Sequence, residues 1–464
     1  MTRRKELSES RIRLEKVRLQ GSETKFEASF DASLSRYLRS GTLRVQYDAP
    51  VEDVDPGIAA IPFVTTVLTV AWATGCTIEL PVLDQRFLNS MESVRQVMKS
   101  WYPGLPFSGG IKSDTVSQTG KTATNREGLL YSGGLDSTAS LIRCLDVKPV
   151  PILVIGTPDL PSSQIDFHRM FLDEVRPFVE RLGLNLHVAQ STMLEMVNLD
   201  ALNSDFGELL GGYWWESVSH GLMLLGACAP LTFTEGIGTL RIAASRTGQF
   251  EEPWGSNPEV DEKVAWGATS VVHDSHDISR QQKIDSLIAP FLRKEVSVLP
   301  LRVCGSTKSK ERLARKTLNC GRCEKCTRTI VGLLAVGVDP RTCSFDMRYF
   351  SAQRLRQGLE GGSVKLPKSV WDLWVDIQAS LRKREKGLDA DSMYGSGPFL
   401  EWLRGYDLER NLYRPSWVSR TFGNSVPRLS ARRRSVELIQ DFKLVTAPVS
   451  PEQDRVQSDA SDTV

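Results

Sequence analysis

The chain has 464 residues, 58 basic against 56 acidic side chains, and a formal net charge of +2. This length allows a large core and more than one domain, while the near-neutral charge argues against non-specific nucleic-acid binding as the main role. We therefore expect nucleic acid to be involved only indirectly. The polar N-terminus lacks an apolar signal region, and the most apolar stretch, 58–73, is short for a membrane span. These features predict a cytoplasmic protein with no membrane partner.

Residues 1–120 predict an N-terminal α+β unit. Apolar residues alternate over 26–30 and 43–47, which indicates strands. A buried helix near 58–73, a strand over 77–81 and a helix over 84–100 should follow. The segment 107–126 is rich in Ser, Gly, Thr and Lys, and its composition predicts a linker.

From residue 127 the pattern changes to strands that alternate with helices. Such alternation predicts an α/β fold with a doubly wound parallel sheet, whose ligands bind beyond the carboxyl ends of the strands. We expect a helical C-terminal region over 346–446, with helices at 369–384 and 397–412, and a disordered tail over 447–464. The first strand of this half is expected at 128–131. Further strands are expected at 150–155, 184–189, 240–244, 270–273 and 296–301. The expected helices are 165–182, 206–228 and 280–293.

The most informative motif is SGGLDS at residues 132–137, between a short apolar strand and a helix. Its adjacent glycines, Gly133 and Gly134, let the backbone approach a bulky anion. The N–H groups of the helix start would point at that anion. Ser132 and Ser137 add hydroxyl donors, with Ser137 expected as the helix cap. The motif therefore predicts a pyrophosphate-binding strand–loop–helix.

Asp136, within the same motif, is a poor direct phosphate contact. We expect it to hold Mg²⁺ or to orient the loop. The motif lacks the terminal Gly-Lys-[Ser/Thr] of a Walker A loop and the spacing of the dinucleotide-binding GxGxxG. Both of these common nucleotide-binding loops are therefore excluded.

Cysteines follow the pattern C-x2-C-x2-C over 320–326, and another thiol lies upstream at Cys304. A tight turn, which Gly321 would allow, brings thiols at i and i+3 together. Four thiolates form the closed tetrahedral site of structural zinc. We therefore predict Zn²⁺ bound by four ligands, namely Cys304, Cys320, Cys323 and Cys326.

Other readings of this cluster stay open. The thiols could be unliganded, or three cysteines could hold an iron–sulfur cluster. Cys343 could also replace Cys304 as the fourth ligand. We prefer Cys304 because it ends the predicted apolar strand that leads into the cluster.

SGGLDS resembles the PP-loop of the N-type ATP pyrophosphatases, which split ATP between the α and β phosphates. Together with the downstream cysteines it resembles the 7-cyano-7-deazaguanine synthase family (QueC/ExsB). The resemblance covers residues 127 to about 340. It implies a PP-loop ATPase domain over 127–345, of the adenine nucleotide α-hydrolase-like fold, that uses ATP, Mg²⁺ and Zn²⁺.

Two looser matches assign further residues through this resemblance. Lys283 falls where PP-loop enzymes often place a phosphate-contacting lysine, so Asp136 and Lys283 become the expected catalytic pair. The segment from Pro253 to Asp261 falls where the family has a substrate-facing loop. This match assigns substrate binding to four residues, Trp254, Gly255, Ser256 and Asp261.

The chain departs from the family in its additional N- and C-terminal regions, in a longer interval between Cys304 and Cys320, and in the residues of the substrate loop. Longer proteins of this kind occur in bacterial anti-phage defence, including the QatC and type IV CBASS groups. There the resemblance implies modification of a macromolecule. Three C-terminal tryptophans, Trp371, Trp374 and Trp402, are candidates to dock a protein partner if they are exposed. The alternative is that they pack the C-terminal region against the core.

The resemblance implies an ATP-dependent ligase that adenylates a carboxylate, that of 7-carboxy-7-deazaguanine, and releases pyrophosphate. Amide or nitrile formation would follow, extending to conjugation of a deazaguanine to a protein partner in a defence complex. The alternatives are a tRNA-thiolating PP-loop enzyme, a plain 7-cyano-7-deazaguanine synthase of queuosine biosynthesis, and a non-catalytic ATP-binding scaffold.

Overall fold

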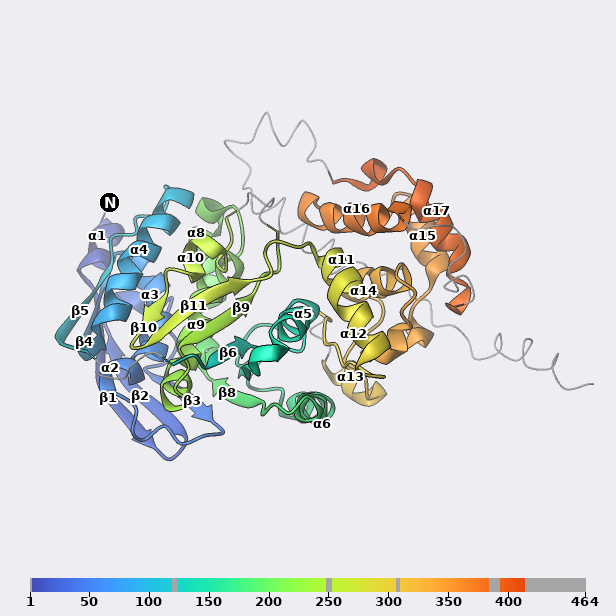
Figure 1. Cartoon of the computed structure of the whole chain (residues 1–464). Coiled ribbons are helices and arrows are strands. Elements are labelled where there is room, and N and C mark those ends of the chain that lie inside the picture. Colours follow the sequence, from blue (N-terminus) through green and yellow to red (C-terminus); the bar gives the residue numbers. More distant parts are fainter. Residues whose placement is uncertain (1, 119–123, 248–252, 306–308, 384–392, 414–464) are drawn as a thin grey trace, which may run out of the picture.

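The structure, a computed structural model, describes residues 2–118, 124–247, 253–305, 309–383 and 393–413 (Figure 1). The predicted tail at 447–464 lies outside these residues. Within them, eleven strands form one sheet in the order β10-β11-β9-β6-β7-β8-β3-β2-β1-β4-β5. The strands are β1 (Arg11–Gln20), β2 (Glu23–Phe30), β3 (Thr42–Tyr47), β4 (Thr77–Asp84), β5 (Gly110–Ser117), β6 (Glu127–Leu130), β7 (Val150–Ile155), β8 (His187–Ser191), β9 (Thr239–Ala243), β10 (Ala265–Trp266) and β11 (Thr269–Asp274).

The strand order β11-β9-β6-β7-β8 forms a parallel half-sheet. β6 comes first along the chain but lies in the middle of this half-sheet, where it pairs in parallel with β7 on one side and with β9 on the other. The chain therefore reverses its winding direction between β6 and β9. In open α/β sheets ligands bind at such a switch point, beyond the carboxyl ends of the strands.

Helices cover both faces of this half-sheet. On one face, side chains such as Ile152 of β7 join a core with α3 (Ile61–Thr74) and α9 (His220–Thr234). On the other face, Leu153 joins a core with α5 (Leu135–Arg143) and α6 (Ile165–Arg181). All six residues of β7 are buried, as expected for a parallel strand covered on both faces. The structure thus confirms an α/β fold with a large, mostly parallel sheet.

The N-terminal strands extend the same sheet. β3 pairs antiparallel with β8, and one hydrophobic core contains side chains from both the N-terminal strands and the parallel half-sheet, such as Phe26 and Leu240. The boundary expected near residue 120 falls between β5 and β6 of this sheet. The linker predicted at 107–126 is wrong over 110–117, where β5 pairs with β4 as an edge strand. Its polar composition reflects an exposed edge strand.

Two other expectations are wrong in the parallel half. The long helix predicted over 206–228 is divided into α8 (Leu199–Leu210), a π-helical turn at Trp215–Ser219 and α9. The break follows Gly211, which has a φ of +62°. Residues 296–301 form no strand, because the backbone N–H of Leu299 donates to the Thr342 carbonyl outside any sheet.

The stretch Trp215–Thr234 is long and apolar enough to cross a membrane by length and composition, and 78% of its best window is buried. It packs against α3 and the sheet, so we regard it as a core helix.

The C-terminal helices pack on the α5/α6 side of the molecule (Figure 1). Trp374 is fully buried there, which contradicts its expected role at an exposed docking surface. The indole of Trp371 donates to the Leu408 carbonyl (3.0 Å), and the ring of Trp402 lies 4.3 Å from that of Tyr406.

The remaining α-helices are α1 (Thr2–Glu9), α2 (Pro56–Ala59), α4 (Gln85–Trp101), α7 (Met193–Met196), α10 (Pro258–Asp261), α11 (Arg280–Lys283), α12 (Ala289–Lys294), α13 (Ser309–Arg315), α14 (Glu324–Leu334), α15 (Ala352–Glu360), α16 (Lys368–Lys383) and α17 (Gly397–Gly405).

Candidate functional site

The SGGLDS loop, residues 132–137, follows β6 and runs into the first turn of α5, at the switch point of the sheet. Gly133 has a φ of +65°, and a Cβ atom added there would lie 2.7 Å from the ring of Phe171. This position therefore requires glycine for both its backbone conformation and its space. The cap of α5 is Gly134; Ser137 lies inside the first turn, so its predicted role as the cap is wrong.

Hydroxyl groups of the loop stabilise its shape. The Ser137 hydroxyl donates to the Gly134 carbonyl (3.2 Å) and accepts from the backbone N–H of Ser132 (3.2 Å). The Ser132 Oγ accepts from the backbone N–H of Gly134 (3.3 Å) and lies 3.1 Å from the Ser137 Oγ. Ser137 is buried and Ser132 is exposed. These hydrogen bonds fix the shape of the turn and leave Ser132 exposed to solvent near the N-terminus of α5.

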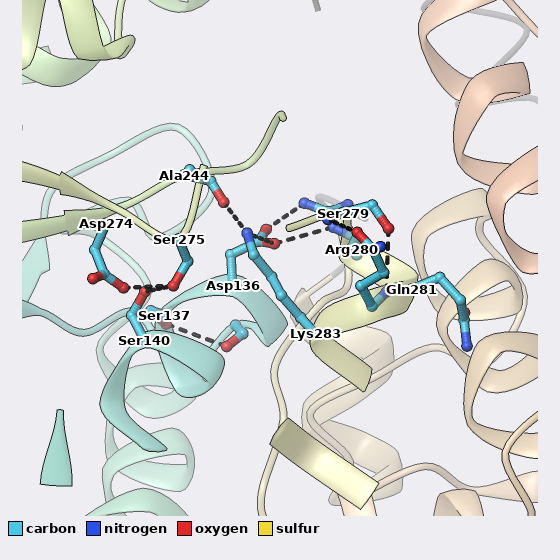
Figure 2. A network of polar contacts seen from close by, with 12 residues as sticks. Asp136, Ser137, Ser140, Ala244, Asp274, Ser275, Ser279, Arg280, Gln281 and Lys283 are labelled. Carbon is cyan, nitrogen blue, oxygen red and sulfur yellow. Dashed lines mark hydrogen bonds and ion pairs between the residues drawn. The ribbon is translucent and has the colours of Figure 1, made fainter. Parts of the chain in front are cut away.

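Asp136 forms ion pairs with two cations of a distant helix, α11 (Figure 2). One Asp136 oxygen lies 3.2 Å from the Nζ of Lys283, and the other accepts from the guanidinium of Arg280. Burial opposes ionisation of Asp136, yet the two cations and their hydrogen bonds hold its pKa well below its usual range. The carboxylate is therefore charged at neutral pH and already neutralised by its neighbours.

Lys283 is almost completely buried, with 1% of its side chain exposed. Its ammonium also donates to the carbonyl of Ala244, directly after β9, so the lysine connects the first turn of α5 to the end of β9 (Figure 2). The arginine partner was missed by the sequence analysis. Arg280 could have been predicted from its i, i+3 spacing to Lys283, because this spacing places both side chains on one face of a helix.

The predicted substrate residues form a second group near the start of α9. Asp261 is fully buried, and its Oδ2 accepts from the Ser256 hydroxyl (2.7 Å) and lies 2.8 Å from the Nδ1 of His273. Gly255 joins the loop to α9, because its carbonyl accepts from the N–H of Gly221 (3.0 Å). His273 lies in β11, the strand beside β9, and the sequence analysis did not assign it.

Trp254 lies beside this group. The Arg246 guanidinium carbon lies 5.5 Å from the centre of the Trp254 ring. The Trp254 Nε1 is buried and has no hydrogen-bond partner among the described residues. The four predicted substrate residues therefore gather around one loop, which contacts the start of α9 and His273 of β11.

The four predicted metal ligands lie together, with every pair of sulfur atoms within 4.8 Å. The Sγ of Cys304 is 3.9 Å from that of Cys323, and the Sγ of Cys320 is 3.9 Å from that of Cys326. Four sulfurs bound tetrahedrally to zinc at ~2.3 Å lie roughly 3.8 Å apart. These cysteines could therefore hold a metal such as zinc.

Cys343 is outside the cluster, and burial raises the pKa of its thiol to about 12. It is therefore a protonated core residue, and the fourth candidate ligand is Cys304. A buried residue that the sequence analysis missed, Asn319, joins the two halves of the site. Its amide donates to the carbonyls of Leu301 (2.7 Å) and Ser344 (3.1 Å), and its oxygen accepts from the N–H of Val303 (3.0 Å).

No known family model, no curated protein and no solved structure matched this chain.

Proposed function

We propose that this protein is an ATP-dependent enzyme of the PP-loop type, which activates a carboxylate by adenylation and releases pyrophosphate. One observation carries the proposal. Asp136, in the first turn of α5, meets Arg280 and Lys283 at the switch point of a parallel sheet. This junction supplies a helix N-terminus and two cations to an anionic ligand, together with a carboxylate for its counter-ion.

The same residues suggest how ATP would bind. The free N–H groups at the start of α5 would receive the pyrophosphate portion, and Arg280 and Lys283 would exchange Asp136 for phosphate oxygens. Asp136 is the residue that would hold Mg²⁺, which neutralises phosphate charge when bound. Positioning and charge stabilisation are the main contributions that a protein makes to such a transfer.

The proposed reaction has two steps. A substrate carboxylate oxygen attacks the α-phosphorus of ATP, the bond to the β-phosphate bridging oxygen breaks, and pyrophosphate leaves. An amine then attacks the acyl carbon of the mixed anhydride, AMP leaves with the bonding pair, and the amine loses a proton to form an amide. From the family resemblance, the proposed acid is 7-carboxy-7-deazaguanine, bound by the loop 253–257 and Asp261. The proposed acceptor is an amine of a protein partner in an anti-phage complex.

The cysteine cluster supports a structural role for Zn²⁺ in this proposal. All four ligands would come from the protein, so no coordination position would remain for a substrate. The metal would fix the segments around Cys304 and Cys320 against α14, while the chemistry would take place at Asp136.

The test uses ATP labelled separately in the α and γ phosphates. The protein is incubated with Mg²⁺, 7-carboxy-7-deazaguanine and either ammonium or candidate partner proteins. Labelled AMP and pyrophosphate are the expected products, and ADP with phosphate would overturn the proposal. Lys283→Met should reduce AMP formation at least 100-fold. The exposed Lys294→Met on the neighbouring helix α12 is the matched control and should leave it unchanged.

Masses of the products identify the acceptor. A mass gain on a partner protein that requires Asp136 supports conjugation. Efficient release of free 7-cyano-7-deazaguanine from ammonium, with no partner present, would make the protein a plain synthase.

A further inference from the structure

The C-terminal helix α16 contacts three segments that surround the candidate nucleotide site. Near its start, the Ser369 carbonyl accepts from the guanidinium of Arg246, which follows β9 (2.9 Å). In its middle, the indole of Trp374 donates to Glu324 of α14 (3.3 Å). Two residues after Trp374, Asp376 contacts the start of α11. A region expected to be an appended docking unit is therefore joined directly to the site.

Asp376 binds the N-terminus of α11. Its Oδ2 accepts from the backbone N–H of Gln281 (3.2 Å) and from the hydroxyl of Ser279, the cap residue of α11. Ser279 forms a capping box with Gln282, so its side chain is occupied within its own helix as well. Asp376 therefore satisfies a helix N–H that the local sequence leaves without an acceptor.

A second contact lies one turn further along both helices. The Ser380 hydroxyl donates to Asp285 (2.8 Å), which also accepts from the side-chain amide of Gln281 (2.8 Å). Between α5, α11, α14 and α16 the packing leaves a cavity of about 10 Å³, lined in part by Arg280 and Ile377. Such a space holds at most about one water molecule. The start of α11 is therefore packed against α16 with little room to shift.

We infer that Asp376 is a positioning residue for the nucleotide site, and that α16 is part of the catalytic unit. Asp376 fixes the first turn of α11, and this turn carries both cations that face Asp136. A shift of about 1 Å in groups that must meet a reacting phosphate can cost on the order of 100-fold in rate. The inference rests on the proposed function, because the positioned cations act on ATP.

The experiment compares three variants of the full chain in the AMP-formation assay. Asp376→Ala removes the acceptor and should lower kcat at least tenfold. Asp376→Asn retains an oxygen acceptor and should keep kcat within about threefold of the unmodified protein. Asp372→Ala is the control: Asp372 lies one turn earlier on α16 and pairs with Lys368 of the same helix, so its loss should leave kcat unchanged.

Metal content and thermal melting of each variant separate positioning from general stability. The inference requires the Asp376→Ala protein to retain its metal and its cooperative melt while kcat falls. If that variant does not fold, Asp376→Glu takes its place; the extra methylene group should displace α11 and lower kcat about tenfold. Full activity of a folded Asp376→Ala or Asp376→Glu protein would overturn the inference. An unmodified protein that forms no AMP would instead overturn the proposed function.

Discussion

Lys283 and Asp136 lie 147 positions apart in the chain, yet the ammonium of one is 3.2 Å from the carboxylate of the other. Because Arg280 shares the same carboxylate, one anion pairs with two cations at this place, and the three side chains together keep a net positive charge. This pairing joins α5, which follows the central strand β6, to α11, which follows β11 at one end of the parallel half-sheet. The residues expected to perform chemistry thus also hold the fold together.

Asp136→Asn should consequently destabilise the protein as well as stop AMP formation. Removing one partner of a buried ion pair costs about 3–5 kcal/mol, because the remaining charge is left uncompensated. Urea unfolding should therefore show a free energy of unfolding lower by about 3 kcal/mol. Asp166→Asn, an exposed aspartate in the first turn of α6, is the matched control and should change it by less than about 0.5 kcal/mol.

The effect of Asp136 should also depend on pH. Its pKa is lower in the folded protein than in the unfolded chain, so its stabilising contribution is fully present above the unfolded pKa of ~3.9. The contribution decreases as the pH falls below that value. The stability difference between the unmodified protein and Asp136→Asn should therefore be constant from pH 7 to 5 and shrink below about pH 4. A constant difference down to pH 3 would contradict a depressed pKa.

Two equally buried cysteines should differ in their effect on metal binding when each is replaced. Cys326 and Cys343 are both fully buried, but only the former lies in the four-sulfur cluster. Cys326→Ser should lose the metal and lower the melting temperature, because structural zinc contributes directly to folding. Cys343→Ser should retain about one zinc per chain, measured by elemental analysis. Iron in the freshly purified protein, or loss of metal from both variants, would contradict the assignment.

The cysteine cluster shows what spacing alone can predict. C-x2-C-x2-C brings three thiols together through local turns alone. The preference for Cys304 over Cys343 used only its place at the end of the apolar stretch that precedes the cluster. The ion pairs of Asp136 are different, because the pairing of 136 with 280 depends on strand order. The order β11-β9-β6 brings the segments that follow β11 and β9 to the same edge of the sheet as the SGGLDS loop, which follows β6. No local pattern contains that information.

Predictions made from composition were wrong at three places, which are an exposed edge strand, a helix interrupted by a glycine and an apolar segment that forms no strand. Residues 110–117 are polar because β5 is the edge of the sheet, so they resembled a linker. The apolar run at 206–228 is interrupted by Gly211, whose positive φ ends α8. The segment 296–301 is apolar because Leu299 and Leu301 fill the core, although their backbone joins no ladder.

Asn319 should support metal retention without touching the metal. It is fully buried and makes three hydrogen bonds that fix the segment before Cys304 against the segment after Cys343. Asn319→Ala leaves these backbone groups without partners, at a cost of about 1–3 kcal/mol. Loss of such outer-shell support typically weakens metal binding 10–100-fold. Competition with a colorimetric zinc chelator measures this change, and the exposed Asn89→Ala on α4 is the control that should bind normally.

Gly133 and Gly183 offer a matched comparison for the SGGLDS loop. Both have a positive φ, +65° and +72°, but an added Cβ meets the Phe171 ring only at Gly133; at Gly183 nothing lies within 4 Å. Alanine at either position incurs the backbone strain of about 1–3 kcal/mol, and overpacking at Gly133 adds about 1–3 kcal/mol more. Gly133→Ala should therefore unfold at lower urea concentration than Gly183→Ala and should lose AMP formation. Adding Phe171→Leu to Gly133→Ala should recover part of the difference, because the two changes share one contact and are not additive. Equal stability of the two alanine variants would show that the loop can move away from Phe171, and that its shape is not fixed by this packing.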